Sequence, residues 1–313
     1  MKKKYTYFQA KIKDSESIAK FVRSENKNKL FTKNYIDWWY FKKKKSGFNF
    51  TVLKYKNKII SISTINNAIF CLNKKITEIG LPQNVVTKKR YRGMGLFSKV
   101  FKTSEKKSIA NKVKKFITFT NAASTPIFIK KFKYKVGICP NILFFPIFPF
   151  KKKSSKLKKV NKIDNFFYYQ NNKHILNNSI IKDKSYLSWR YEKNLDKNTH
   201  LLEYKKDNQS QSLIMIKFGY KKNIKICYLL DCLGSVDKSL LRELKKYIAN
   251  NRSYLFLCLE NDYFKKLYSS SFFFRIKKKF NFLVKAENNK ETNKLSKTKF
   301  NITFGDLDFI NLL

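Results

Sequence analysis

The chain has 313 residues, a formal net charge of +48, and 43% hydrophobic and 16% aromatic residues. This length and apolar content are enough to bury a large core, which excludes wholesale disorder and favours about two domains. Lysine supplies nearly all of the 69 basic residues and is spread over almost every segment. Nucleic-acid sites usually include arginine, whose planar fork binds phosphates and bases, so we expect no dedicated nucleic-acid interface.

The first half contains a series of predicted strands and helices. We expect strands at 5–12, 51–55, 58–64, 75–80, 84–87 and 116–120, and helices at 15–24 and from Leu96 onward. Asp14 is a candidate N-cap of the first helix. Lys56-Asn57 separates two alternating apolar runs, which is typical of a hairpin.

A lysine-rich run at 151–159 follows a proline-rich apolar stretch at 138–150. Like charges repel one another and favour solvent, so the run predicts a linker. We therefore expect an N-terminal domain at 1–150, a basic linker at 151–164 and a C-terminal domain at 165–313.

The second half repeats the pattern of the first. We expect strands at 201–204, 212–218, 224–230 and 254–259, a helix carrying Leu240 to Ile248, and a closing strand at 299–304. Tyr35-Ile36-Asp37-Trp38-Trp39-Tyr40 recurs as Tyr186-Leu187-Ser188-Trp189-Arg190-Tyr191. Each half then has a strand, a glycine turn, a helix, a strand and an Asn, which favours an internal duplication. The tryptophans are expected to be core residues.

Five cysteines, an odd number, are widely spaced within apolar runs and predict free thiols in a reducing compartment. The chain has two histidines and no C-x-x-C pair, so we expect no metal site. The N-terminus lacks the apolar core of a signal peptide, and the longest apolar stretch is too short to span a membrane. These features predict a cytoplasmic protein, which an anionic membrane surface would attract without insertion.

The segment 84–100 holds the clearest functional signal. A β-branched strand leads into Arg92-Gly93-Met94-Gly95-Leu96-Phe97, and an apolar helix follows. Such a turn directs several backbone N–H groups and the positive end of the helix dipole at one point, which suits a pyrophosphate. Gly93 and Gly95 allow the backbone to approach the anion closely.

This segment resembles the acyl-CoA signature of the GNAT superfamily, Arg/Gln-x-x-Gly-x-Gly/Ala, with Arg92 leading and Gly95 central; Phe97 departs from the expected small residue. The resemblance implies an α/β fold of two GNAT-like lobes with mixed, mostly antiparallel sheets flanked by helices. It also implies that acetyl-CoA serves as cosubstrate and that its pantetheine arm lies along the strand of Val85 and Thr87, held by Asn121.

The resemblance implies transfer of an acyl group to an amine; because relatives of this bacterial type are associated with surface polysaccharide, the expected acceptor is an amino sugar or nucleotide sugar. Glu78 occupies the strand where many members place a general base, although a lone Glu on a strand is more often solvated. The family's frequent Tyr acid falls at Phe128, which has no proton to give. In the second half, Asp231 and Asp237 flank Gly234 and predict that no pyrophosphate binds there.

Two alternatives remain open from the sequence. The Fem-type aminoacyl-tRNA-dependent transferases also have tandem GNAT lobes, but they generally lack an Arg-Gly-x-Gly turn. A non-catalytic CoA-binding or interaction protein would account for Phe97 and Phe128. The sequence gives neither the acceptor nor the oligomeric state.

Overall fold

The computed structural model describes residues 5–26, 29, 31–42, 46–148, 154–163, 177–192, 197–206, 209–262, 264, 273–276 and 281–307. The chain forms two units. Unit 1 contains residues 1–70, 75–139 and 280–299, and unit 2 contains 71–74, 140–279 and 300–313. Both are α/β, as the sequence predicted.

Unit 1 has a mixed, mostly antiparallel sheet in the order β1-β2-β3-β4-β5-β15-β6. Its strands are β1 (Tyr5–Gln9), β2 (Phe48–Tyr55), β3 (Lys58–Leu72), β4 (Lys75–Thr87), β5 (Lys115–Thr120), β6 (Lys135–Val136) and β15 (Asn281–Ala286). The β2–β3 turn contains Lys56 and Asn57, both at positive φ. The predicted hairpin is confirmed, and the strands expected at 75–80 and 84–87 are one long strand.

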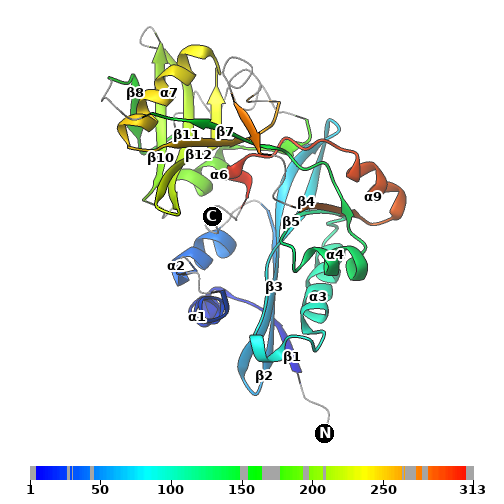
Figure 1. Ribbon diagram of the computed structural model, residues 1–313. Coiled ribbons are helices and arrows are strands. Elements are labelled where there is room, and N and C mark those ends of the chain that lie inside the picture. Colours follow the sequence, from blue (N-terminus) through cyan, green and yellow to red (C-terminus); the bar gives the residue numbers. More distant parts are fainter. Residues whose placement is uncertain are drawn as a thin grey trace. The chain divides into compact units, whose positions relative to one another are not determined.

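Helices cover both faces of this sheet (Figure 1). The helices α1 (Ser15–Asn26) and α2 (Lys33–Ile36) lie on one face, and α3 (Leu96–Ala110) and α4 (Thr125–Phe132) lie on the other. The short π-helical turn η2 (Asp37–Phe41) continues α2, and α9 (Asn289–Ser296) follows β15. An aromatic cluster that includes Phe101, Phe116 and Phe128 fills the space beneath α3 and α4.

Unit 2 is built around a second sheet, in the order β14-β7-β13-β12-β11-β10-β8. Its strands are β7 (Ile142–Pro146), β8 (Leu157–Val160), β9 (Ser179–Ile180), β10 (Thr199–Lys206), β11 (Gln209–Lys221), β12 (Ile224–Gly234), β13 (Leu255–Leu259) and β14 (Phe274–Ile276). β9 is not part of this sheet. Helix α7 (Lys238–Asn250) buries the predicted leucine stripe against one face of the sheet.

The second unit also has a four-residue helix, α6 (Lys184–Leu187), followed by a π-helical turn, η4 (Ser188–Glu192), as α2 and η2 do in unit 1. The side chain of Thr32 caps the N-terminus of α2, and the side chain of Asp183 caps that of α6. Trp38, Trp39 and Trp189 are all buried, so the prediction that they are core residues is confirmed. All five cysteines are free, as expected.

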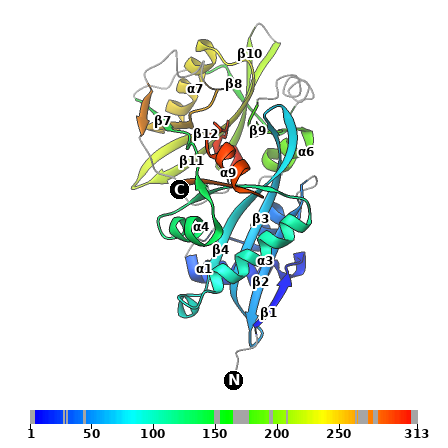
Figure 2. The ribbon, with the colours of Figure 1, turned by 90° about the vertical axis from the view of Figure 1, so that its right-hand side faces the viewer.

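The two units differ from the expected domain split in two segments. β7 lies before residue 150 yet belongs to the unit 2 sheet, between β13 and β14. β15 lies in the C-terminal half yet belongs to the unit 1 sheet, where it pairs with β5 from Asn281↔Thr120 to Ala286↔Lys115. Figure 2 shows β3, β4 and α3 of unit 1 from a second side.

Two further segments have a different local structure from the one expected. The predicted linker 151–164 includes β8, because Leu157 is buried and the strand pairs with β10. The predicted strand 299–304 is not a strand; Phe300, Ile302 and Phe304 are buried, but their segment ends in the short 3-10 helix η5 (Phe304–Asp306). The alternation of buried apolar residues in this segment is therefore present without the backbone hydrogen bonds of a strand.

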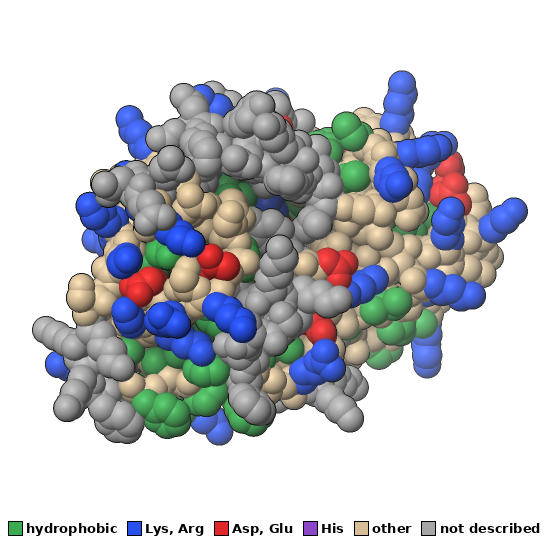
Figure 3. All heavy atoms as spheres, turned by 90° about the horizontal axis from the view of Figure 1, so that it is seen from above, with side chains coloured by type: hydrophobic (Ala, Val, Ile, Leu, Met, Phe, Trp, Pro, Cys, Tyr) green, Lys and Arg blue, Asp and Glu red, His purple; other side chains and the backbone are tan. Residues whose placement is uncertain are grey.

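Lys and Arg side chains are scattered over the face that Figure 3 draws rather than gathered in a single patch. This agrees with the spread of lysine along the sequence. Among the described helices, none is long and apolar enough to cross a membrane.

Candidate functional site

The turn that follows β4 has the backbone conformation predicted from its glycines. A 3-10 helix, η3 (Lys89–Tyr91), comes first, and Gly93 and Gly95 have φ values of 79° and 71°. Gly95 is the N-cap of α3 and lies in the left-handed region. A Cβ added at either glycine would meet no atom within 4 Å, so the space above the turn is open.

The N-terminus of α3 has unsatisfied donors. Gly95 offers no side-chain cap, and the first bond into the helix runs from the Lys99 N–H to the Gly95 carbonyl at 3.1 Å. Within the described part of the chain, the N–H groups of residues 93–98 donate to no acceptor. These donors and the helix dipole favour an anion at this end of α3.

Arg92 stands at the entrance to this turn. Its Nε donates to the Thr87 carbonyl at 3.1 Å, and its guanidinium lies 4.0 Å from a carboxylate oxygen of Glu25 on α1. Glu25 also accepts from the Lys89 N–H at 2.8 Å. Glu25 was not predicted as a site residue, and it holds the loop and the guanidinium in place while more than half of the Arg92 side chain stays exposed.

The remaining residues of the predicted signature divide into core and surface. Thr87 and Leu96 are buried, and the Thr87 hydroxyl is 2.8 Å from that of Ser61. Val85 is partly buried beneath α3, and Met94 is exposed. Phe97, the departure from the family pattern, packs edge-on to Phe128 and stacks with Phe132. Its bulk is therefore accommodated between α3 and α4, away from the turn.

The parallel strands β4 and β5 are paired at one position only. In the described residues their ladder consists of Gly80 and Phe116. A Cβ on Gly80 would lie 2.6 Å from the Phe116 ring, so glycine is needed for this close approach. Beyond this pair Pro82 has no N–H to donate, and the Thr118 hydroxyl donates to its carbonyl at 2.9 Å. The backbone groups of β4 after Gly80 thus face β5 without a regular ladder.

β4 contains a bulge that the sequence analysis missed. Asn84 has a φ of 46°, and the side chains of Gln83 and Asn84 both bond to residues of η2. Trp39 donates to Gln83 at 2.9 Å, and Asn84 donates to the Tyr40 hydroxyl at 2.7 Å. Consecutive residues of a regular strand face opposite sides, so the bulge directs both toward η2.

Tyr40 completes the group around this bulge. Its hydroxyl is 3.2 Å from that of Thr64, and burial raises the pKa of Tyr40 to about 12 despite the bonds to Thr64 and Asn84. Tyr40 therefore keeps its proton at neutral pH. The only signal in the sequence was the tolerance of Asn for positive φ, which is too common to identify a bulge.

Asn121 comes directly after β5, as expected, but its side chain has a local role. Its Oδ1 accepts from the N–H and the hydroxyl of Ser124, both at 2.9 Å. Its carbonyl accepts from the N–H of Thr125 at 3.0 Å. Asn121 is thus the turn residue that leads into α4, with an exposed side chain.

Neither Glu78 nor α4 shows an organised acid or base. Glu78 is half-buried on β4, two residues before Gly80, and makes no hydrogen bond or ion pair in the described part of the chain. Phe128 is 3% exposed and belongs to the aromatic core, so a hydroxyl there would be buried. The exposed neighbour, Ile129, carries no proton to donate either.

The corresponding turn of unit 2 is closed. Gly234 has a φ of 87°, and Asp237 is the N-cap of α7, where its Oδ1 accepts from the Leu240 N–H and the Ser239 hydroxyl, both at 2.8 Å. Asp237 therefore occupies the position that an anion would take. Asp231 does not flank the turn as the sequence suggested; it is buried on β12, at a bulge in the β11–β12 ladder.

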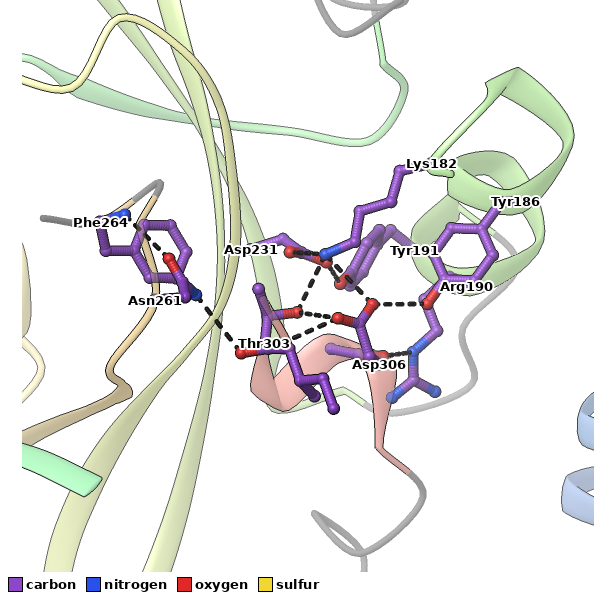
Figure 4. A network of polar contacts seen from close by, with 11 residues as sticks. Lys182, Tyr186, Arg190, Tyr191, Asp231, Asn261, Phe264, Thr303 and Asp306 are labelled. Carbon is purple, nitrogen blue, oxygen red and sulfur yellow. Dashed lines mark hydrogen bonds and ion pairs between the residues drawn. The ribbon is translucent and has the colours of Figure 1, made fainter. Parts of the chain in front are cut away.

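Asp231 is part of a buried polar network beside η4 (Figure 4). Lys182 contacts Asp231 and lies 3.1 Å from Asp306 and 3.0 Å from the Thr303 hydroxyl. The Tyr191 hydroxyl donates to Asp231. In unit 1 the hydroxyl of Tyr40, the last residue of the related motif, also bonds to a strand residue, but it accepts the bond from Asn84.

The C-terminal segment packs onto this network. Arg190 donates to the carbonyls of Gly305 at 2.7 Å and Leu307 at 3.1 Å. A Cβ on Gly305 would collide with the Tyr191 hydroxyl and with Asp231. The turn Gly305-Asp306-Leu307 is therefore a buried anchor of unit 2.

Comparisons with known proteins give a fold and nothing finer. No family model matches the chain, and no curated protein matches its sequence. Solved structures do match. A GCN5-related N-acetyltransferase from Anabaena variabilis aligns with a TM-score of 0.66 at 10% identity, over 91% of this chain and 73% of that one.

Two further structures extend the likeness. A putative acetyltransferase from Pyrococcus horikoshii gives 0.62 at 13% identity, over 97% of this chain and 95% of that one. The Saccharomyces cerevisiae N-myristoyltransferase with bound myristoyl-CoA gives 0.62 at 11% identity, over 90% of this chain and 82% of that one. At these identities the likeness establishes the fold alone.

Proposed function

We propose that this chain, which has the fold of the GCN5-related N-acetyltransferases, takes an acyl group from acyl-CoA and transfers it to an amine. The observation that carries the proposal is the open N-terminus of α3. Its unpaired N–H groups directly follow a strand, β4, whose ladder with β5 ends at Gly80. Both features suit one extended ligand with a pyrophosphate at one end.

In this proposal the pyrophosphate binds the N–H groups of residues 93–98, and Arg92 adds a positive charge beside it. The pantetheine arm lies along Val85 and Thr87, where β4 has no regular pairing with β5. Asn121 stands at the end of β5, and its amide nitrogen is the part of its side chain left for this arm. The neighbouring yeast N-myristoyltransferase holds an acyl-CoA, which supports this ligand class.

The chemistry is aminolysis of a thioester. The amine nitrogen attacks the carbonyl carbon, a C–N bond forms, the C–S bond breaks, and the amine gives up a proton while the thiolate gains one. Thiolates are good leaving groups, so solvent can protonate this one where α4 offers Phe128 and Ile129. We assign the base to Glu78, acting through water.

A non-catalytic CoA-binding protein is the second candidate, and the apolar residues of α4 favour it. Such a protein would have the same CoA site as the proposed acyltransferase but would not transfer the acyl group. The acceptor in the first candidate is proposed as an amino sugar or nucleotide sugar. A Fem-type reaction would instead require an aminoacyl-tRNA donor, which the open turn does not favour over CoA.

Calorimetry with CoA and acetyl-CoA tests the site, and an amine panel tests the reaction. We expect one CoA per chain, and we expect Arg92→Ala to weaken binding by about tenfold through loss of one phosphate charge. Glu78→Gln should lower kcat with little change in CoA affinity. No CoA binding at moderate salt would refute the proposal, whereas binding without acylation of any amine, thioester hydrolysis included, would favour the second candidate.

A further inference from the structure

We propose that one end of the unit 2 sheet docks onto an anionic lipid bilayer. This end consists of the β11–β12 turn with its flanking residues, Tyr220 to Lys225, and the loop Asn251 to Tyr254 between α7 and β13. We call it the basic-aromatic end. The inference goes beyond acyl transfer and does not depend on it.

Strand pairing brings these segments together. Lys222 and Asn223 form a tight turn with φ values of 47° and 63°, and Tyr220 pairs with Lys225 across the hairpin. The Tyr254 N–H donates to the Lys225 carbonyl at 3.0 Å. The Lys225 ammonium donates to the Asn251 carbonyl at 2.7 Å, which ties the loop to the hairpin.

Apolar side chains are concentrated at this end. Tyr220 is 67% exposed, Tyr254 is 53% exposed and Ile224 is 46% exposed. Phe148 is also exposed and follows Ile147, whose N–H donates to the Tyr254 carbonyl at 2.8 Å. These four are all but one of the large hydrophobic residues exposed in the described part of unit 2, and the other, Phe274, lies on β14. Clustered exposure of this kind marks an interaction site.

The charge at this end has one sign. Lys221, Lys222 and Arg252 are exposed, and the sequence has no Asp or Glu at 218–228 or 245–257. Positive charge is spread over the whole chain, so charge alone does not distinguish this end. The combination of positive charge with exposed tyrosine and isoleucine side chains distinguishes this end from the rest of the described part of unit 2.

A bilayer surface fits both components. Tyrosine and isoleucine at the tips of turns can enter the boundary between headgroups and acyl chains, while lysine and arginine reach lipid phosphates. A single-stranded nucleic acid would gain from stacking on the tyrosines, but Ile224 has no ring to stack on, and arginine is scarce. An anionic membrane is the partner that can contact the exposed tyrosines, Ile224 and the basic residues of this end together.

Sedimentation with lipid vesicles tests the proposal. The parent protein should bind vesicles of phosphatidylcholine mixed with phosphatidylglycerol and should not bind phosphatidylcholine alone. The variant Tyr220→Ser/Ile224→Ser/Tyr254→Ser keeps its charge, and we expect its partition into mixed vesicles to fall by about tenfold or more. Lys221→Gln/Lys222→Gln/Arg252→Gln should fall similarly, and the parent's binding should weaken as salt rises.

Matched controls lie in unit 1. Ile76→Ser/Val136→Ser removes two residues that are 74% and 62% exposed, and Lys106→Gln/Lys130→Gln/Lys131→Gln removes three exposed charges. Both should bind vesicles like the parent. A serine variant that binds like the parent, a control that loses as much, or a parent that binds RNA but not vesicles would overturn the proposal. CoA affinity should be equal in all five proteins, so the outcome is separate from that of the proposed acyltransferase site.

Discussion

The N-termini of α3 and α7 differ in their capping side chain: one helix end is left open and the other is closed. Both helices follow a strand and a glycine at positive φ, and both lead to a strand parallel to the first. Gly95 leaves the N–H groups of α3 unpaired, whereas Asp237 caps α7. Burial raises the pKa of Asp237, but the bonds from Leu240 and Ser239 outweigh it and hold the pKa below its usual value.

The polar residues around Asn84 in unit 1 and around Asp231 in unit 2 also differ in charge. In unit 1 Tyr40, Thr64 and Asn84 are neutral. In unit 2 Tyr191 contacts a buried carboxylate that is balanced by Lys182 and sealed by the C-terminal segment. The buried charges of this unit 2 network are therefore paired with one another, while unit 1 keeps an open N-terminus at α3.

Gly95→Asp should convert the turn of unit 1 into that of unit 2 and eliminate measurable CoA binding. The new carboxylate would cap α3 and repel the pyrophosphate. The positive φ of 71° adds a modest stability cost, about 1 kcal/mol. Calorimetry measures the loss.

Lys238→Asp is the matched control, because it adds a carboxylate to the exposed first residue of α7. Its CoA affinity should equal that of the parent. Gly234→Asp is unsuitable, since a Cβ there would collide with the Gln211 carbonyl. Equal loss in both variants, or two CoA per chain in the parent, would contradict the difference between the units.

Lys182→Ala should destabilise unit 2 by about 3–5 kcal/mol, because it leaves Asp231 and Asp306 buried without a counter-charge. Urea unfolding measures the change. Lys114→Ala removes an exposed ion pair with Glu287 and should cost less than about 1 kcal/mol. If the two variants were equally stable, the network would not anchor the C-terminal segment.

The same network predicts a pH dependence. Burial alone lowers the pKa of Lys182, but Asp231 and Asp306 raise it above the ordinary 10.5. A lysine with a raised pKa stabilises the fold fully below its ordinary pKa, and this stabilisation is lost as pH rises through the raised value. The deficit of Lys182→Ala should therefore be constant near neutral pH and shrink in strongly alkaline solution, measured by urea unfolding at each pH.

Asp237→Ala should have the smallest effect, a loss of about 1 kcal/mol from the missing cap. It should also gain no measurable CoA affinity, because the α7 turn lacks an arginine at the position of Arg92. Thermal unfolding and calorimetry together check both statements. Measurable CoA binding by this variant would mean that the cap alone separates the units.

The sequence predicted what is local and missed what is distant. The turn at Gly93 and Gly95 follows from residue types at short spacing, since few other residues accept those φ values. The bulge at Asn84 and the burial of Asp231 depend on partners about 40 residues away, Tyr40 and Tyr191. No pattern along the chain identifies such partners.

The pairing of β15 with β5 was the least predictable feature. Phe282, Leu283 and Val284 are apolar like the residues of many strands, and their partners lie more than 160 residues earlier in the chain. Register is set by tertiary packing here, so the segment could not be assigned to unit 1 from its own residues.

The position of β15 also affects how the chain is made. On the ribosome β5 emerges long before residues 281–286, so its edge stays unpaired until β15 has been made. The strand that bounds the proposed pantetheine position can thus reach its final pairing only after β15 has been synthesised. A fragment ending at residue 150 would keep this edge of β5 without its β15 partner.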